Sequence, residues 1–107
     1  MITESTLFTL ARSFPNVTEE PHFDKTSFRV KRKIFATYDA KANTACVKLN
    51  VIDQDVFVST NRSSIYPATG KWGAQGWTMI ELKTVHNDVL TDALTTAYHT
   101  VAHPSKP

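Results

Sequence analysis

The chain has a single cysteine, three glycines and no apolar run long enough to cross a membrane. The lone cysteine, Cys46, excludes an internal disulfide framework and is typical of a reducing compartment. The N-terminal residues MITESTLFTLARSF lack the basic start and continuous apolar stretch of a signal peptide. We therefore expect a cytoplasmic protein without membrane association, and its 107 residues leave room for one domain, 1–107.

Catalytic and metal-binding motifs are also missing. All three glycines lie in PATGKWGAQG, residues 67–76, which is neither a GxGxxG fingerprint nor a P-loop, because tryptophan follows its Gly-Lys pair. His99 and His103 have zinc-binding spacing on a helix, but the third ligand is absent. Cys46 alternates onto the polar side of its strand with Lys48, where an inert thiol is the simplest interpretation. We predict no enzyme activity, no catalytic residue, no metal site and no cofactor.

Basic residues are concentrated in one segment although the net charge is only +2. Between Asp24 and Lys33, five basic residues face one acid, a local charge of +4. The five are Lys25, Arg29, Lys31, Arg32 and Lys33. One interpretation is that hairpin tips and edge strands carry charge for solubility. The other is a ridge that attracts anions, phosphate above all.

Aromatic and β-branched residues from 22 to 38 predict a hairpin that reverses at Lys31 and Arg32. A two-residue turn there pairs Arg29 with Ile34 on one face of the sheet, whereas a three-residue turn reverses the faces. The sequence is compatible with both.

The remaining periodicity predicts helices and strands in a clear order. Residues 16–22 read as a polar connector. A helix is expected near residues 3–14, strands within 22–38 and 46–51, a short helix from 53 or 54, an extended piece at 65–66, a strand at 77–82 and a long helix from 87 that Pro104 stops. This order, α-β-β-β-α-β-β-α, indicates an α+β fold with a single antiparallel sheet, helices on one face and the other face partly open.

The glycine-rich segment 67–76 predicts a long loop with two interpretations. Trp72 folds back onto the sheet in the first. In the second, Lys71 and Trp72 are exposed together, a cation beside a stacking platform that suits bases or a protein partner.

Three stretches resemble the MmcQ/YjbR family of small bacterial proteins: HFDKTSFRVKRKIFATYD (22–39), YPATGKWGAQGWTMIEL (66–82) and LTTAYHTVAHPSK (94–106). The positions that match are Phe28, Arg29, Lys33, Phe35, Lys71, Trp72, Gly73, Gly76 and Thr78. The resemblance implies a frataxin-like or secretion-chaperone-like α+β domain with a "double-wing" motif and a DNA-binding role. It brings no catalytic residues. Many relatives have a small residue in the hairpin turn, where this chain has Lys31 and Arg32.

A frataxin-like fold raises iron binding as an alternative. Hard cations need clustered carboxylates, and the first predicted helix offers only Glu4 while the first strands are basic. Iron binding is therefore not expected.

These observations favour a non-enzymatic protein that binds nucleic acid through the basic hairpin and the glycine-rich segment, mostly by phosphate contacts. The predicted nucleic-acid-binding residues are Lys25, Arg29, Lys31, Arg32, Lys33, Lys71 and Trp72. The alternative is a protein-interaction or chaperone-like module that uses the open sheet face, and a weaker one is binding of a small anionic metabolite. A continuous basic strip would favour nucleic acid, and an apolar groove a protein partner. We expect a monomer or a weak dimer.

Overall fold

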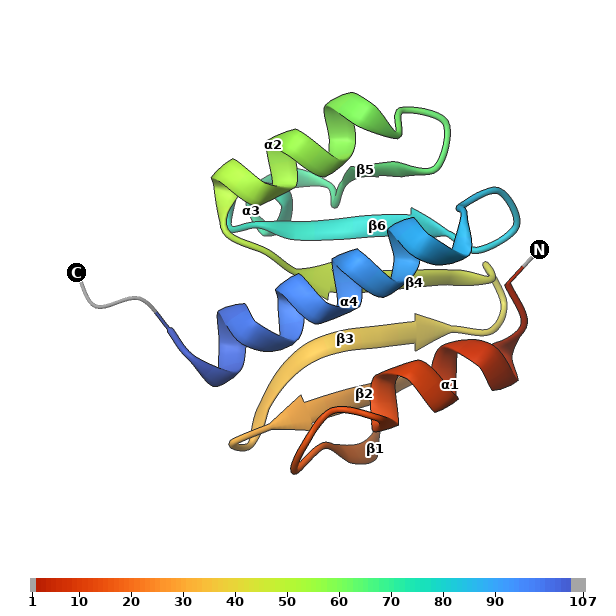
Figure 1. The fold of residues 1–107 in the computed structure, drawn as a ribbon, viewed down its shortest axis with the longest axis vertical. Helices are drawn as coiled ribbons and strands as arrows, with labels where there is room; N and C mark the ends of the chain where they lie inside the picture. Colours follow the sequence, from red (N-terminus) through yellow and green to blue (C-terminus); the bar gives the residue numbers. More distant parts are fainter. Residues whose placement is uncertain (1, 105–107) are drawn as a thin grey trace.

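One six-stranded antiparallel sheet runs through the protein in the computed structural model, which describes residues 2–104 (Figure 1). The strands are β1 (Thr18–His22), β2 (Lys25–Val30), β3 (Lys33–Asp39), β4 (Thr44–Lys48), β5 (Ile65–Pro67) and β6 (Trp77–Glu81). The helices are α1 (Glu4–Arg12), α2 (Val51–Thr60), α3 (Gly70–Ala74) and α4 (Asn87–Ala102). The strand order in the sheet is β1-β2-β3-β4-β6-β5. The predicted α+β class with a single antiparallel sheet is confirmed.

Helices α1 and α4 lie over the same face of the sheet (Figure 1). The apolar stripe predicted for the C-terminal helix is buried there, with Leu90, Leu94 and Ala97 fully covered. Phe28 and Phe35 come from the strands beneath it and are equally inaccessible. Because strand side chains alternate between faces, the same strands send their other residues to the opposite, uncovered face.

Side-chain caps set the starts of the first two helices. The Thr3 hydroxyl accepts a hydrogen bond of 3.1 Å from the backbone N–H of Thr6 and begins α1. The Asn50 side chain accepts one of 2.8 Å from the N–H of Asp53 and begins α2. Helix α2 therefore starts at Val51, two or three residues earlier than its predicted start at 53 or 54, because Asn50 supplies the cap.

Two elements differ from the prediction. The polar connector contains β1, whose residues Thr18–Pro21 are all exposed, so no burial pattern marks them as a strand. The glycine-rich segment contains the short helix α3 rather than only a loop. The observed order is thus α-β-β-β-β-α-β-α-β-α.

Within residues 2–104, no helix combines the length and apolar character that a membrane span requires. The last two residues of the stretch LTTAYHTVAHPSK lie outside the described part of the chain.

Candidate nucleic-acid interface

The β2–β3 turn consists of Lys31 and Arg32, with φ angles of 53° and 68°. Val30 pairs with Lys33 and Arg29 with Ile34, so the two-residue turn is the correct alternative. Such turns need a positive φ at both positions and therefore favour Asn-Gly. A left-handed conformation costs a residue with a Cβ about 1–2 kcal/mol. The turn must therefore be stabilised by contacts elsewhere.

Lys31 makes such a contact. Its Nζ donates a hydrogen bond of 2.7 Å to the carbonyl oxygen of Ala102, the last residue of α4. Carbonyls at a helix C-terminus lack backbone partners and form the negative end of the helix dipole. Lys31 therefore ties the hairpin tip to the C-terminus of α4, a structural role that the sequence did not reveal.

Two further predicted cations are also engaged within the fold. Arg29 donates from Nε to the Ser27 hydroxyl at 3.0 Å and lies 3.9 Å from the Glu20 carboxylate. Lys25 forms an ion pair with Asp24 at 3.2 Å, and this hydrogen bond lowers the pKa of the Asp24 carboxyl. Much of the local positive charge is therefore matched by neighbouring acceptors.

Arg32 and Lys33 are exposed at the hairpin tip. Among residues 2–104, neither lies within ion-pair distance of an acidic group. They are consequently the two hairpin cations best placed to meet an external anion.

Helix α3 presents the other predicted pair. The Trp72 side chain is 55% exposed, which settles the choice between a buried and an exposed tryptophan. The Lys71 ammonium lies 5.7 Å from the centroid of the Trp72 ring, within cation–π range. The structure therefore brings Lys71 and Trp72 together at the surface.

Two glycines make this arrangement sterically feasible. A Cβ at Gly73 would lie 2.0 Å from the carbonyl oxygen of Ala68, and one at Gly76 would lie 1.8 Å from that of Leu49. Gly76 also has a φ of 101°. The absence of a side chain at Gly73 lets α3 pack against Ala68, the residue that follows β5. The absence of one at Gly76 lets the chain pass close to Leu49 immediately before β6 begins.

The uncovered face of the sheet holds a groove with a volume of about 470 Å³. It runs from the β1–β2 turn, across β3, β4 and β6, to α3. Its floor is mostly apolar, and Phe23 and Trp72 stand at its two ends. The lining side chains that the argument uses are Phe23, Ile34, Thr44, Trp72, Trp77 and Met79.

Phe23 and Trp77 were missed as site residues. Phe23 was interpreted as part of a strand, but it occupies the β1–β2 turn with a φ of 59° and is 92% exposed. Trp77 lies on β6 with the Lys48 ammonium 5.7 Å from its ring centroid. The alternation of Trp77, Met79 and Glu81 opposite the buried Thr78 and Ile80 is the sequence signal that could have placed them on the open face.

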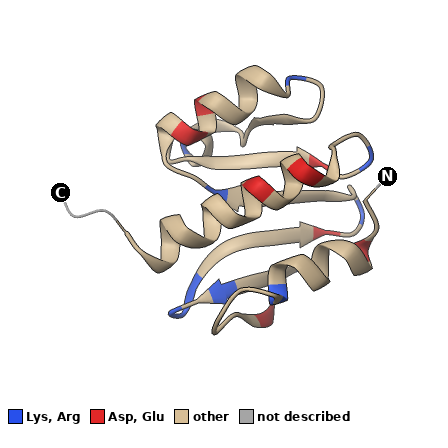
Figure 2. Cartoon of the chain, in the orientation of Figure 1, with Lys and Arg blue, Asp and Glu red and all other residues tan. Residues whose placement is uncertain are grey.

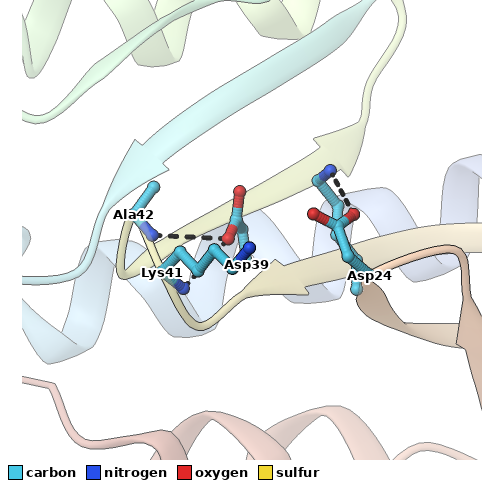
Figure 3. Close-up of polar contacts among 5 residues, drawn as sticks. Asp24, Asp39, Lys41 and Ala42 are labelled. Atoms are coloured by element: carbon cyan, nitrogen blue, oxygen red, sulfur yellow. Dashed lines mark hydrogen bonds and ion pairs between the residues drawn. The ribbon is translucent and has the colours of Figure 1, made fainter.

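The carboxylates at the Phe23 end of the groove have hydrogen-bond or ion-pair partners within the fold. Figure 3 shows the Asp39 carboxylate accepting hydrogen bonds from the backbone N–H groups of Lys41, at 3.0 Å, and Ala42, at 3.3 Å. These bonds close the β3–β4 turn. The ion pair of Asp24 with Lys25 lies nearby. The backbone N–H groups and the Lys25 ammonium therefore partly offset the charges of these two carboxylates.

The two ends of the central strands differ in charge. β3 begins at Lys33 and β4 ends at Lys48, so these lysines lie at the same end of the antiparallel sheet. β3 and β6 end at the acidic residues Asp39 and Glu81, at the opposite end. Figure 2 shows basic residues gathered at the β2–β3 turn and acidic residues on α2 and α4. The basic end is where an anionic ligand would be attracted.

Among residues 2–104, the remaining thiol and imidazole groups do not form a metal-binding set. Burial raises the pKa of the Cys46 thiol to about 11, which fits the inert interpretation of this residue. The His99 and His103 rings stack with centroids 5.5 Å apart. In the described residues, no three His, Cys, Asp or Glu side chains lie close enough to hold a metal ion.

Comparisons with known proteins agree with this architecture. A protein of Deinococcus radiodurans, DR2400, which carries a DUF419 domain, has a similar crystal structure with a TM-score of 0.85 and 20% identity, over 100% of this chain and 83% of that one. A crystal structure of a protein from Pseudomonas syringae has a TM-score of 0.69 and 12% identity, over 94% of this chain and 99% of that one. These similarities show the fold. No curated protein matches the sequence.

The sequence itself was compared with protein families. Residues 12–100 match the family described as YjbR, so the match extends from the end of α1 almost to the end of α4. The basic hairpin, the α3 segment and the open sheet face all lie inside the matched region. The chain therefore belongs to the YjbR family.

Proposed function

We propose that this protein binds nucleic acid on the open face of its sheet and acts by binding rather than by catalysis. The observation that carries the proposal is the exposed pair of Lys71 and Trp72, with the ammonium 5.7 Å from the ring centroid, at one end of a groove that Phe23 and Trp77 also line. Cations beside stacking surfaces suit a ligand that alternates phosphates with flat bases. Arg32 and Lys33 at the hairpin tip add charge for further phosphates.

This proposal assigns less of the phosphate binding to the β2–β3 hairpin than the sequence alone indicated. Four of the cations have partners within the fold and contribute less to phosphate binding than their number indicates: Lys25, Arg29, Lys31 and Lys48. Sequence recognition by a helix is not part of the proposal. The polar face of α4 offers no basic side chain for base edges: Thr91, Asp92, Thr95, Thr96 and His99.

A salt series of fluorescence anisotropy with labelled oligonucleotides tests the proposal. The variant Lys33→Glu/Lys71→Glu should weaken binding of every sequence and flatten the slope of log K against log salt by about 1.4–1.8, at ~0.7–0.9 per phosphate. Arg62→Glu/Lys83→Glu is the matched control, because both residues are exposed and lie in the α2–β5 and β6–α4 connections, outside the β2–β3 turn and α3. It makes the same change in net charge and should leave the slope nearly unchanged.

A second function is supported by a different observation. The groove floor is mostly apolar and Phe23 is 92% exposed, which also suits a protein partner with an apolar segment. Binding of a protein partner would depend little on salt. If neither duplex nor single-stranded oligonucleotides bind at about 50 mM salt, the nucleic-acid proposal fails and the protein-partner function takes its place.

A further inference from the structure

The groove offers exposed aromatic rings at both ends and one in its floor. Phe23 and Trp72 are 92% and 55% exposed, and Trp77 is half-buried. The rings of His22 and Phe23 meet edge to face, 4.8 Å apart at 70°, and this contact leaves Phe23 92% exposed. Duplexes hide the faces of their bases, whereas single strands expose them for stacking on aromatic side chains. Within a nucleic-acid ligand, these rings can therefore stack only on bases that are unpaired.

Thr44 provides an independent observation in the same groove. Its hydroxyl is buried and has no hydrogen-bond partner among the described residues. Thr44 faces the groove from β4, because its neighbour Ala45 pairs with Tyr38 and Ile80 on the helix-covered side. Buried polar atoms without partners are rare in folded proteins. A rotation of the Thr44 side chain that turned this hydroxyl toward the groove would let a base edge supply the missing hydrogen bond.

We propose that the groove binds about two or three nucleotides of a single strand, with bases stacked on Phe23, Trp72 and Trp77. This inference rests on the proposed function and specifies its ligand. The strand crosses β3, β4 and β6 diagonally between the β1–β2 turn and α3. Lys71 contacts a phosphate beside the stacked bases, whereas the Lys48 ammonium donates to the carbonyl oxygen of Gln75 and stays within the fold. Recognition is largely independent of sequence, because every base has a face that can stack.

The experiment compares labelled strands of oligothymidine and oligouridine, about ten nucleotides long, with a duplex of equal length. Phe23→Ala and Trp72→Ala remove exposed rings, so both variants should fold. Ile52→Ala is the matched control, because it truncates a side chain that is 78% exposed on α2 and lies outside the groove. Circular dichroism and thermal melting establish that each variant keeps its fold.

We expect both single strands to bind at least tenfold more tightly than the duplex. Phe23→Ala and Trp72→Ala should each weaken single-strand binding roughly 5- to 150-fold while Ile52→Ala has no effect. Tryptophan fluorescence should fall on binding, by a smaller amount in Trp72→Ala. The ratio of oligothymidine to oligouridine affinity shows whether the 2′-hydroxyl of RNA is recognised.

Equal binding of duplex and single strand, with no effect of either ring deletion, would overturn the single-strand inference. It would leave the proposed phosphate-dominated function standing. Failure of all three nucleic acids to bind at about 50 mM salt would overturn both.

Discussion

The two faces of the sheet are built from alternate residues of the same strands, yet they are packed very differently. On the helix-covered face, Phe14 stacks on Tyr98 at 4.8 Å and Phe35 meets Tyr98 edge to face at 5.5 Å. The Tyr98 hydroxyl is satisfied by a hydrogen bond of 2.7 Å to the carbonyl oxygen of Pro15. On the open face, Ile34 and Met79 remain half-buried, and the Lys48 ammonium lies 5.7 Å from the centroid of the Trp77 ring.

Because of this difference, adjacent residues in one strand should affect different properties: stability for the covered face and ligand affinity for the open face. Aromatic rings on the covered face contact other rings and exclude water, so their removal should cost stability. Rings and lysines on the open face have room for a ligand, so their removal should cost affinity. Neighbouring residues in one strand can therefore have opposite functions, and substitutions can test this.

The largest expected effect comes from Phe35, which is fully buried on the covered face. Phe35→Ala should lower the free energy of unfolding by about 3–5 kcal/mol, because it removes a ring and leaves a cavity. Its neighbour Ile34 lies on the open face, and Ile34→Ala should cost only about 1 kcal/mol. Urea denaturation followed by circular dichroism measures both. Equal losses for the two variants would show that the open face is part of the core.

The next largest effect is expected for the glycines near the two ends of helix α3, at the edge of the open face. Gly76→Ala should lower the free energy of unfolding by about 2–4 kcal/mol, because its φ of 101° and the Leu49 carbonyl oxygen both oppose a Cβ. Gly70→Ala is the comparison, since Gly70 has a φ of 64° but nothing within 4 Å of its added Cβ. It should cost only about 1 kcal/mol. Denaturation curves that rank the two in the reverse order would contradict this account of the glycines.

A smaller effect distinguishes the two turn residues. Lys31→Gln should lower the free energy of unfolding by about 1 kcal/mol, because it removes the charged donor to the Ala102 carbonyl at the end of α4. Arg32→Gln makes the same change of charge one residue further on and should be nearly neutral. Arg32→Gly should raise stability by up to about 1 kcal/mol, because Arg32 has a φ of 68°. Thermal melting ranks the three variants, and a loss with Arg32→Gln equal to that with Lys31→Gln would refute the helix-end role.

Much of the covered face could be predicted from the sequence, because burial leaves a periodic pattern. The stripe of α4 and the alternation around Val47 and Leu49 predicted the elements that now form the core. β1 left no such signal, since Thr18–Pro21 are exposed and only backbone pairing with β2 defines the strand. Helix α3 was hidden by Gly70 and Gly73, because glycine weakens helices, and the close approach of Gly73 to Ala68 is visible only in three dimensions.

The candidate site was predicted less completely, because partners distant in the sequence determine it. The local charge drew attention to Lys31, but its bond to Ala102 spans 71 residues and no local pattern reveals it. Lys71 and Trp72 were recognised as a pair. Phe23 and Trp77 were not, because the groove exists only when the β1–β2 turn and α3 are brought to opposite ends of one sheet face.

The smallest expected effect separates the faces most cleanly. Thr44→Val keeps the shape of the side chain and removes a hydroxyl that is buried without a partner in the described chain. Since no hydrogen bond is lost, the free energy of unfolding should stay the same or rise by up to about 1 kcal/mol. Affinity for single-stranded oligothymidine should fall by roughly 2- to 10-fold if a base edge uses this hydroxyl. Thr44→Ser retains the hydroxyl and should keep most of the affinity. If Thr44→Val destabilises the protein, the hydroxyl has a structural partner. If affinity is unchanged while stability rises, the groove floor makes no polar contact with the strand, and stacking and charge alone hold the ligand.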